Sequence, residues 1–179
     1  MNETTLDCLT DRHLQLFGTI IQWFAQYESL MEDVMATVTG SDFAAVMLLT
    51  RGLDFNAKRL ALLDLLRHRA VPLDHFDRVC AYLTIPQNLT PLRNDILHST
   101  WRSSEPPNSI QPNWILRLPP SIVPLRTDPN APDEAFIEHI QDEMAYTLDD
   151  LDKIAVTLAG NHHRFFEYLH KVGLVRSTA

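Results

Sequence analysis

The sequence predicts an all-α protein, a bundle of about five helices with a proline-rich, partly extended insertion before the last helix. Apolar residues recur at three- and four-residue steps through long stretches of the chain, which is the period of an amphipathic helix. Glycine or proline ends most of these stretches. Eight of the eleven prolines fall between residues 101 and 132, where no helical period is possible.

Length and composition indicate one domain. The chain has 179 residues, of which 45% are hydrophobic, enough for one core. We therefore expect a single domain over residues 1–179, with the insertion at about 101–132. Cys8 and Cys80 give no disulfide framework and are typical of a reducing compartment.

Nothing in the sequence indicates a leader or a membrane span. The first residues, MNETTLDCLTDR, carry acids where a secretory leader carries lysines, and the apolar run 16–24 is too short to cross a bilayer. We therefore expect a cytoplasmic protein with no membrane partner. A net charge of −8 argues against a broad nucleic-acid-binding face, although basic residues gather between 58 and 69.

Three helices are expected in the first part of the chain. The first runs over about 11–38 and stops at Gly40. Ser41 caps a short second helix that ends near Gly52, and Asp54 caps a third that ends at Val71-Pro72. The third helix has a buried stripe of apolar residues: Phe55, Leu62, Leu63 and Leu66.

A fourth helix opens at Asp74, with Phe76, Val79 and Leu83 facing inward. Pro86 should interrupt it, and Thr90-Pro91 should restart a helix with proline at its first position.

The region after residue 101 is expected to be extended or loop-like. The segments 114–118 and 122–125 are either short edge strands or extended loop, and 136–140 is either helical or a short strand. Thr147 and Asp150 resemble a capping box at the start of a long terminal helix. Its predicted apolar stripe is Leu148, Leu151, Ile154, Ala155, Leu158, Phe165, Phe166 and Leu169.

The sequence Arg93-Asn94-Asp95-Ile96-Leu97-His98 is the strongest candidate for chemistry. Arginine can hold a phosphate with a planar fork of donors, and histidine can move protons near neutral pH. An arginine with a histidine four to six residues later occurs three times in the chain, so the spacing alone is weak. Only Arg93 is followed by asparagine within an expected helix. The alternative is an arginine and a histidine on a half-exposed helix edge without a chemical role.

Arg93, Asn94 and His98 take different angular positions around an α-helix. A five-residue step leaves Arg93 and His98 roughly 140° apart around the helix, whereas Asn94 and His98 share a face. Asn94 could therefore orient the imidazole, and the helix C-terminus would favour its protonated form. Trp101 is either a base-stacking platform or a core residue.

Arg93-Asn94-x-x-x-His98 resembles the RNxxxH signature of HEPN domains. Similar features flank it in the same order: Gly18, Trp23 and Tyr27-Glu28 on the first helix, Phe55-x-x-Lys58 on the third, and Tyr146–Leu151 at the opening of the last helix. The resemblance in element order covers about residues 11–170, and the specific motif covers only 92–101. The proline-rich insertion and Ser99, where many members have glycine, depart from the family pattern.

The resemblance implies a homodimer in which two motif helices form a composite cleft that cleaves RNA without a metal ion or other cofactor. His98 would act as general base or acid, Arg93 would stabilise charge on the phosphate, and Asn94 would position the histidine or the substrate. Glu28 would be an accessory polar residue, or else a solvated or capping glutamate. Relatives of this kind act as toxins with a cognate antitoxin, in defence, or in RNA processing, and others are inactive binding modules.

Two other hypotheses compete with the ribonuclease hypothesis. His163, Glu167 and His170 share one helical face, with His162 adjacent, but no HExxH motif or cysteine pair accompanies them, so a solvated face is favoured over a metal site. An acidic helical dimer could also be a non-catalytic adaptor or a nucleotide-binding protein.

Overall fold

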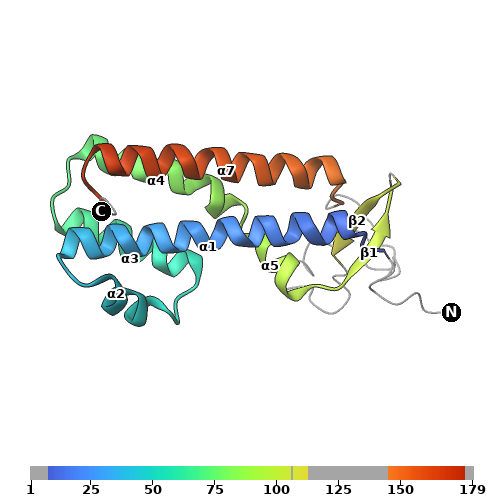
Figure 1. Cartoon of the computed structure of the whole chain (residues 1–179), viewed down its shortest axis with the longest axis horizontal. Coiled ribbons are helices and arrows are strands. Elements are labelled where there is room, and N and C mark those ends of the chain that lie inside the picture. The colour runs from blue at the N-terminus through green and yellow to red at the C-terminus, as the bar shows by residue number, and fades with distance from the viewer. Residues whose placement is uncertain (1–7, 106, 113–144, 176–179) are drawn as a thin grey trace, which may run out of the picture. The chain divides into compact units, whose positions relative to one another are not determined.

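The computed structural model describes residues 8–105, 107–112 and 145–175 and confirms the predicted all-α class (Figure 1). The helices are α1 (Asp11–Thr39), α2 (Phe43–Thr50), α3 (Phe55–His68), α4 (Leu73–Asn88), α5 (Thr90–His98) and α7 (Leu148–Lys171). A two-stranded sheet follows α5 and consists of β1 (Trp101–Ser104) and β2 (Ser109–Pro112).

The described residues fall into two compact units. The first unit contains the residues up to Gly18 and those from Asn94 to Lys153; the second contains Thr19–Arg93 and the residues from Ile154 onward.

Several helix ends lie where local sequence signals predict them. α1 ends one residue before Gly40, whose φ of +70° is the left-handed conformation that glycine adopts without strain. The Asp54 carboxylate accepts a hydrogen bond of 2.8 Å from the Ala57 amide and caps α3. Thr147 and Asp150 exchange side-chain and backbone hydrogen bonds at the start of α7, as the capping-box prediction requires.

Two predicted helix starts need correction. Asp42, not Ser41, caps α2, because its carboxylate accepts a hydrogen bond from the Ala44 amide. The Ser41 amide instead donates to the Ala36 carbonyl and closes the end of α1. α4 begins one residue before Asp74, with Pro72 at the N-cap position and no side-chain cap.

Pro86 does not interrupt α4, contrary to the prediction. Proline has no N–H, so the Tyr82 carbonyl four residues earlier lacks its usual helical donor. The Asn161 side chain of α7 supplies a replacement, because its Nδ2 donates to that carbonyl at 2.8 Å. α4 therefore continues through the buried Pro86 to Asn88. A new helix, α5, does start at Thr90-Pro91, with Pro91 at its second position and not at its first.

The sheet is an antiparallel hairpin that was not predicted. Trp101 pairs with Pro112 and Ser104 with Ser109, while Asn108 in the turn adopts a positive φ of 65°. The strands and helix considered at 114–118, 122–125 and 136–140 lie outside the described residues.

The first unit has a small aromatic core. The Phe17 and Trp101 rings lie 4.7 Å apart between centroids, and Tyr146 packs edge-on against Trp101 at 6.3 Å. Ile110 and Tyr146 exchange backbone hydrogen bonds, which ties β2 to the start of α7.

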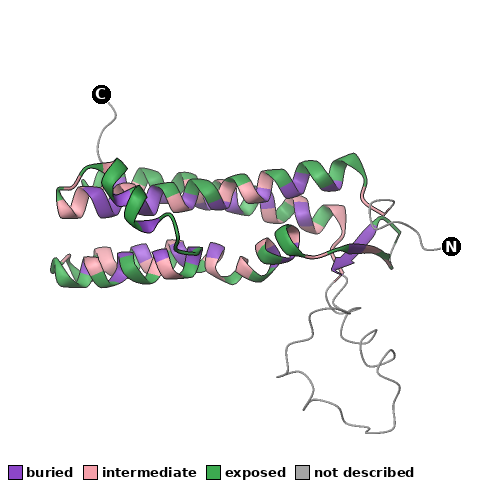
Figure 2. Ribbon diagram, turned by 90° about the horizontal axis from the view of Figure 1, so that it is seen from below, coloured by how far each residue is buried: buried purple, intermediate pink, exposed green. Residues whose placement is uncertain are grey.

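The second unit buries the apolar stripes of its helices. Figure 2 shows buried residues recurring along the helices with exposed residues between them. Phe24 of α1 meets Phe55 of α3 edge-to-face, and Tyr82 of α4 stacks on Phe165 of α7. The predicted stripe of α3 is buried throughout, whereas Phe166 of α7 is exposed.

Within the described residues, no helix combines the length and the apolar character that crossing a lipid bilayer requires.

Candidate functional site

All three motif residues stand on α5, which ends at His98. The Ser99 amide closes the last turn by donating to the Asp95 carbonyl at 2.9 Å. Arg93 belongs to the second compact unit, whereas Asn94 and His98 belong to the first.

Arg93 lies beside a carboxylate of α1. Its side chain is 25% exposed, and its Nη2 is 4.0 Å from Oε1 of Glu28. A separation of 4.0 Å is the outer limit of an ion pair and longer than a charge-assisted hydrogen bond. Glu28, which the sequence reading left open between an accessory and a solvated role, therefore has Arg93 as a neighbour.

Glu28 and Arg93 belong to a polar group inside the second unit that we name the Lys58 cluster. The Lys58 ammonium of α3 donates to Oε2 of Glu28 at 2.7 Å and lies 2.8 Å from Oε1 of Glu32. The Thr50 hydroxyl donates to the same Glu32 oxygen at 2.7 Å. The cluster thus joins α1, α2, α3 and α5, and consists of Glu28, Glu32, Thr50, Lys58 and Arg93.

The Lys58 cluster balances its charges although it is largely buried. The Lys58 and Glu32 side chains are 8% and 7% exposed. Burial disfavours the ammonium, but its hydrogen bonds to Glu28 and Glu32 and their negative charges outweigh that effect and raise the pKa of Lys58. Two carboxylates face two cations, so Lys58 stays charged at neutral pH.

His98 and Asn94 are both exposed on α5. Asp95 between them is buried, so the helix presents the asparagine and the histidine on its accessible side. An exposed imidazole at a helix end is accessible to a substrate and to water.

Trp101 is a core residue in this structure. Its side chain is only 4% exposed, and its ring packs against Phe17 and Tyr146. The indole therefore offers no free face on which a nucleobase could stack. Trp23 is partly buried, and Trp114 lies outside the described residues.

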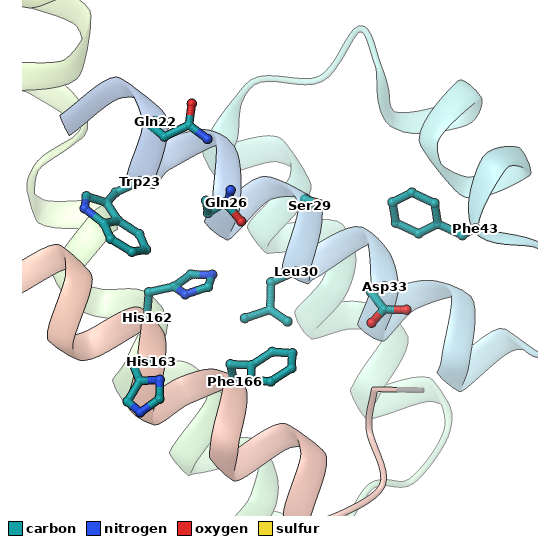
Figure 3. A pocket seen from close by; sticks show the side chains of 10 residues that line it. All are labelled: Gln22, Trp23, Gln26, Ser29, Leu30, Asp33, Phe43, His162, His163 and Phe166. Carbon is teal, nitrogen blue, oxygen red and sulfur yellow. The ribbon is translucent and has the colours of Figure 1, made fainter. Parts of the chain in front are cut away.

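A second candidate region is an open cavity of about 700 Å³ in the second unit (Figure 3). α1 and α7 form its two long sides, and Phe43 at the start of α2 adds an aromatic edge. Its lining is Gln22, Trp23, Gln26, Ser29, Leu30, Asp33, Phe43, His162, His163 and Phe166.

The two histidines of this cavity differ in environment. His162 points from α7 toward Gln26 and Leu30 of α1 (Figure 3). Burial lowers the pKa of His162, although a hydrogen bond with the Gln26 backbone opposes the shift. His163 is exposed, and its Nε2 lies 3.3 Å from Oε1 of Glu167. In the part of the chain that the structure describes, no group of three or more His, Cys, Asp or Glu side chains could hold a metal ion.

The grouping of Lys58 with Glu32 and Thr50 was not predicted. Lys58 occupies a position of the apolar stripe of α3, three residues after Phe55 and four before Leu62. A lysine in a buried stripe needs a buried carboxylate partner, and this is the signal that points to Glu28 and Glu32.

No family model, curated protein or solved structure matches this chain significantly.

Proposed function

We propose that this protein is a metal-independent endoribonuclease of the HEPN type. One observation carries the proposal: α5 bears Arg93, Asn94 and His98 and ends at an exposed His98, while Arg93 lies next to the Glu28 carboxylate. The same helix thus holds a residue for phosphate charge and a residue for proton transfer.

In the proposed reaction, the 2′-hydroxyl of a nucleotide attacks the adjacent phosphate. His98 removes the proton from that hydroxyl as the new P–O bond forms, and the Arg93 guanidinium stabilises the negative charge on the phosphate oxygens. The 5′-oxygen of the next nucleotide leaves and takes a proton from an acid, which leaves a 2′,3′-cyclic phosphate. Asn94 positions the imidazole or the substrate.

The proposal includes a homodimer, because a second copy would bring a second histidine to act as the acid in that step. A role as a toxin with an antitoxin partner, in defence, or in RNA processing belongs to the same proposal. Its residues supply both proton transfer and charge stabilisation, so the chemistry requires no metal ion.

A non-catalytic adaptor is the second candidate, and exposed apolar residues on α2 favour it. The Leu48 and Leu49 side chains are 61% and 83% exposed, which is typical of a protein-binding surface when such residues lie together.

Cleavage of single-stranded RNA in excess EDTA tests the nuclease proposal. We expect His98→Ala to lower the rate by at least about 100-fold, since general acid–base catalysis contributes about 10²–10⁴-fold. Arg93→Ala should lose activity to a similar degree. His163→Ala, which replaces an exposed histidine of α7, is the matched control and should retain full activity.

Unchanged cleavage by His98→Ala would contradict the assignment of His98. A wild-type protein that dimerises but cleaves no RNA would instead favour the adaptor.

A further inference from the structure

α2 exposes an apolar surface where a helix at the surface of a globular protein ordinarily exposes polar side chains. At about 100° per residue, the buried Val46 and Thr50 and the partly buried Phe43 occupy an arc of roughly 60°. The remaining arc of roughly 200° carries only exposed apolar residues. We name this surface the α2 face, and its members are Ala44, Ala45, Met47, Leu48 and Leu49.

The α2 face has small residues at one end and large residues at the other. Ala44 and Ala45 lie in its N-terminal half. Leu48 and Leu49 lie in its C-terminal half and are 61% and 83% exposed. Large side chains of one helix pack best beside small ones of its neighbour, because the two then interdigitate. A helix with the opposite order of sizes would therefore fit the α2 face.

A second copy of α2 that runs antiparallel to the first has that opposite order. When a two-fold axis passes through the middle of such a pair, Ala45 of one copy lies at the level of Leu48 of the other. Ala44 and Leu49 are related in the same way. Each level of the pair then holds one small and one large side chain, so the α2 face is complementary to itself.

The charged residues that flank α2 favour the same arrangement. Asp42 and Arg51 stand at opposite ends of the helix, and both are exposed. Asp42 accepts a hydrogen bond from the Ala44 amide, and within the described residues neither Asp42 nor Arg51 forms an ion pair. An antiparallel pair brings Asp42 of each copy to the same end as Arg51 of the other, so opposite charges meet. A parallel pair would bring like charges together.

We propose that α2 is a self-association surface, on which two copies of the chain pack α2 against α2, antiparallel about a two-fold axis. Each copy carries a net charge of −8, so the copies repel one another least where the contact surface is uncharged. The inference goes beyond the proposed function, because no residue of α5 enters it. It also names the partner of a surface that an adaptor would use for a different protein.

An exchange of side chains tests the pairing of sizes, with self-association of the full chain measured by sedimentation equilibrium. L48A leaves a gap and A45L crowds two leucines at one level. Because each change occurs twice in the pair, each variant should weaken self-association at least about tenfold. A45L/L48A restores one large and one small side chain at each level and should recover most of the wild-type affinity. V156A, at a 65% exposed valine of α7, is the matched control and should leave the affinity unchanged.

A second pair of variants tests the charges at the ends of the helix. R51E places two acidic residues at each end of the pair and should weaken self-association, more at low salt than at high salt. D42S/R51E removes that repulsion while serine can still cap α2, so this variant should regain affinity. Far-UV circular dichroism establishes that each variant is folded.

A wild type that stays monomeric at its highest soluble concentration would overturn the inference, even if α2 binds phosphatidylcholine vesicles or another protein. Unchanged association of folded L48A and A45L would also overturn it, and so would an A45L/L48A variant that associates no better than its parents. In these last two cases the copies meet through another surface, and the nuclease proposal stands. A wild type that pairs through α2 but cleaves no RNA would support the inference and overturn the nuclease proposal.

Discussion

Tyr27 and Glu28 are neighbours on α1 but belong to two polar networks of opposite character. Glu28 enters the charged Lys58 cluster, which joins α1 to α2, α3 and α5. Tyr27 enters an uncharged network in which Asn161 Nδ2 donates to its hydroxyl at 2.6 Å. That hydroxyl in turn donates to the Leu158 carbonyl at 3.3 Å.

Both networks join helices, but one does so through neutral groups and the other through charged groups. Asn161 donates both to Tyr27 and to the Tyr82 carbonyl, so the neutral network connects α1, α4 and α7 through groups that never ionise at ordinary pH. Breaking one of its bonds leaves an unpaired dipole, which costs far less than an unpaired buried charge. The charged network is costlier to disturb, and it contains Arg93.

The largest expected effect comes from breaking the charged network on its own. Lys58→Met should lower the free energy of unfolding by about 3–5 kcal/mol, since it leaves two carboxylates buried with one cation. Urea unfolding at neutral pH measures the loss. Lys153→Met, at an exposed lysine of α7, is the control and should change stability by less than about 0.5 kcal/mol. A comparable loss in both variants would contradict the cluster's importance.

The neutral network should give a smaller effect with a distinctive pH dependence. Tyr27→Phe should cost about 1–2 kcal/mol at neutral pH through the lost hydroxyl. Burial raises the pKa of Tyr27 from 10.0 to about 12. The wild type therefore loses stability as pH rises from the unfolded-state value of 10.0 through the folded-state value of about 12, because the unfolded chain ionises first.

Since phenylalanine cannot ionise, the advantage of the wild type over Tyr27→Phe should shrink across that interval. Chemical unfolding at several alkaline pH values measures the difference. An advantage that stays constant would mean that Tyr27 is less protected from ionisation than its burial implies.

The smallest expected effect concerns His162, which packs against Tyr27 of the neutral network and should change how stability depends on pH. Its ring lies edge-on to Tyr27 at 5.1 Å, and burial lowers its pKa. As pH falls below about 6.5, His162 becomes protonated in the unfolded chain before it does so in the folded protein. Stability should therefore decline as pH falls from that value through the lowered pKa of the folded state.

His162→Leu should flatten this decline between pH 7 and 5, because leucine cannot take up the proton. His13, whose pKa burial also lowers, should supply part of the remaining slope. The adjacent, exposed His163 is the matched control, and His163→Leu should leave the slope unchanged. If both variants flattened the decline of stability with pH equally, burial of His162 would not be its cause.

Features of the fold that depend on neighbouring residues could be predicted from the sequence. Gly40, Asp54 and Thr147 act on amides or carbonyls within a few residues, so their signals are complete in a short window. Asp42 displaced Ser41 as a cap because adjacent capping residues compete, and only the backbone geometry decides between them.

Features that depend on distant partners could not be predicted. Pro86 fits within α4 because of Asn161, a residue 79 positions from Tyr82. The short hairpin at 101–112 was missed because its strands span only four residues each and carry no strong alternation.

The candidate site shows the same limit. The motif on α5 could be recognised in the sequence, but the contacts that its residues make with other helices could not be predicted. Arg93 proved to lie beside Glu28, and Trp101 to be buried against Phe17. Both facts depend on contacts with α1, which a sequence motif does not encode.

The bond from Asn161 to the Tyr82 carbonyl has a consequence for the order in which the protein is made. A ribosome synthesises α4 well before it reaches Asn161, so the nascent helix lacks one donor beside Pro86 until α7 emerges. The last helix thus completes the hydrogen bonding of a helix that was made much earlier.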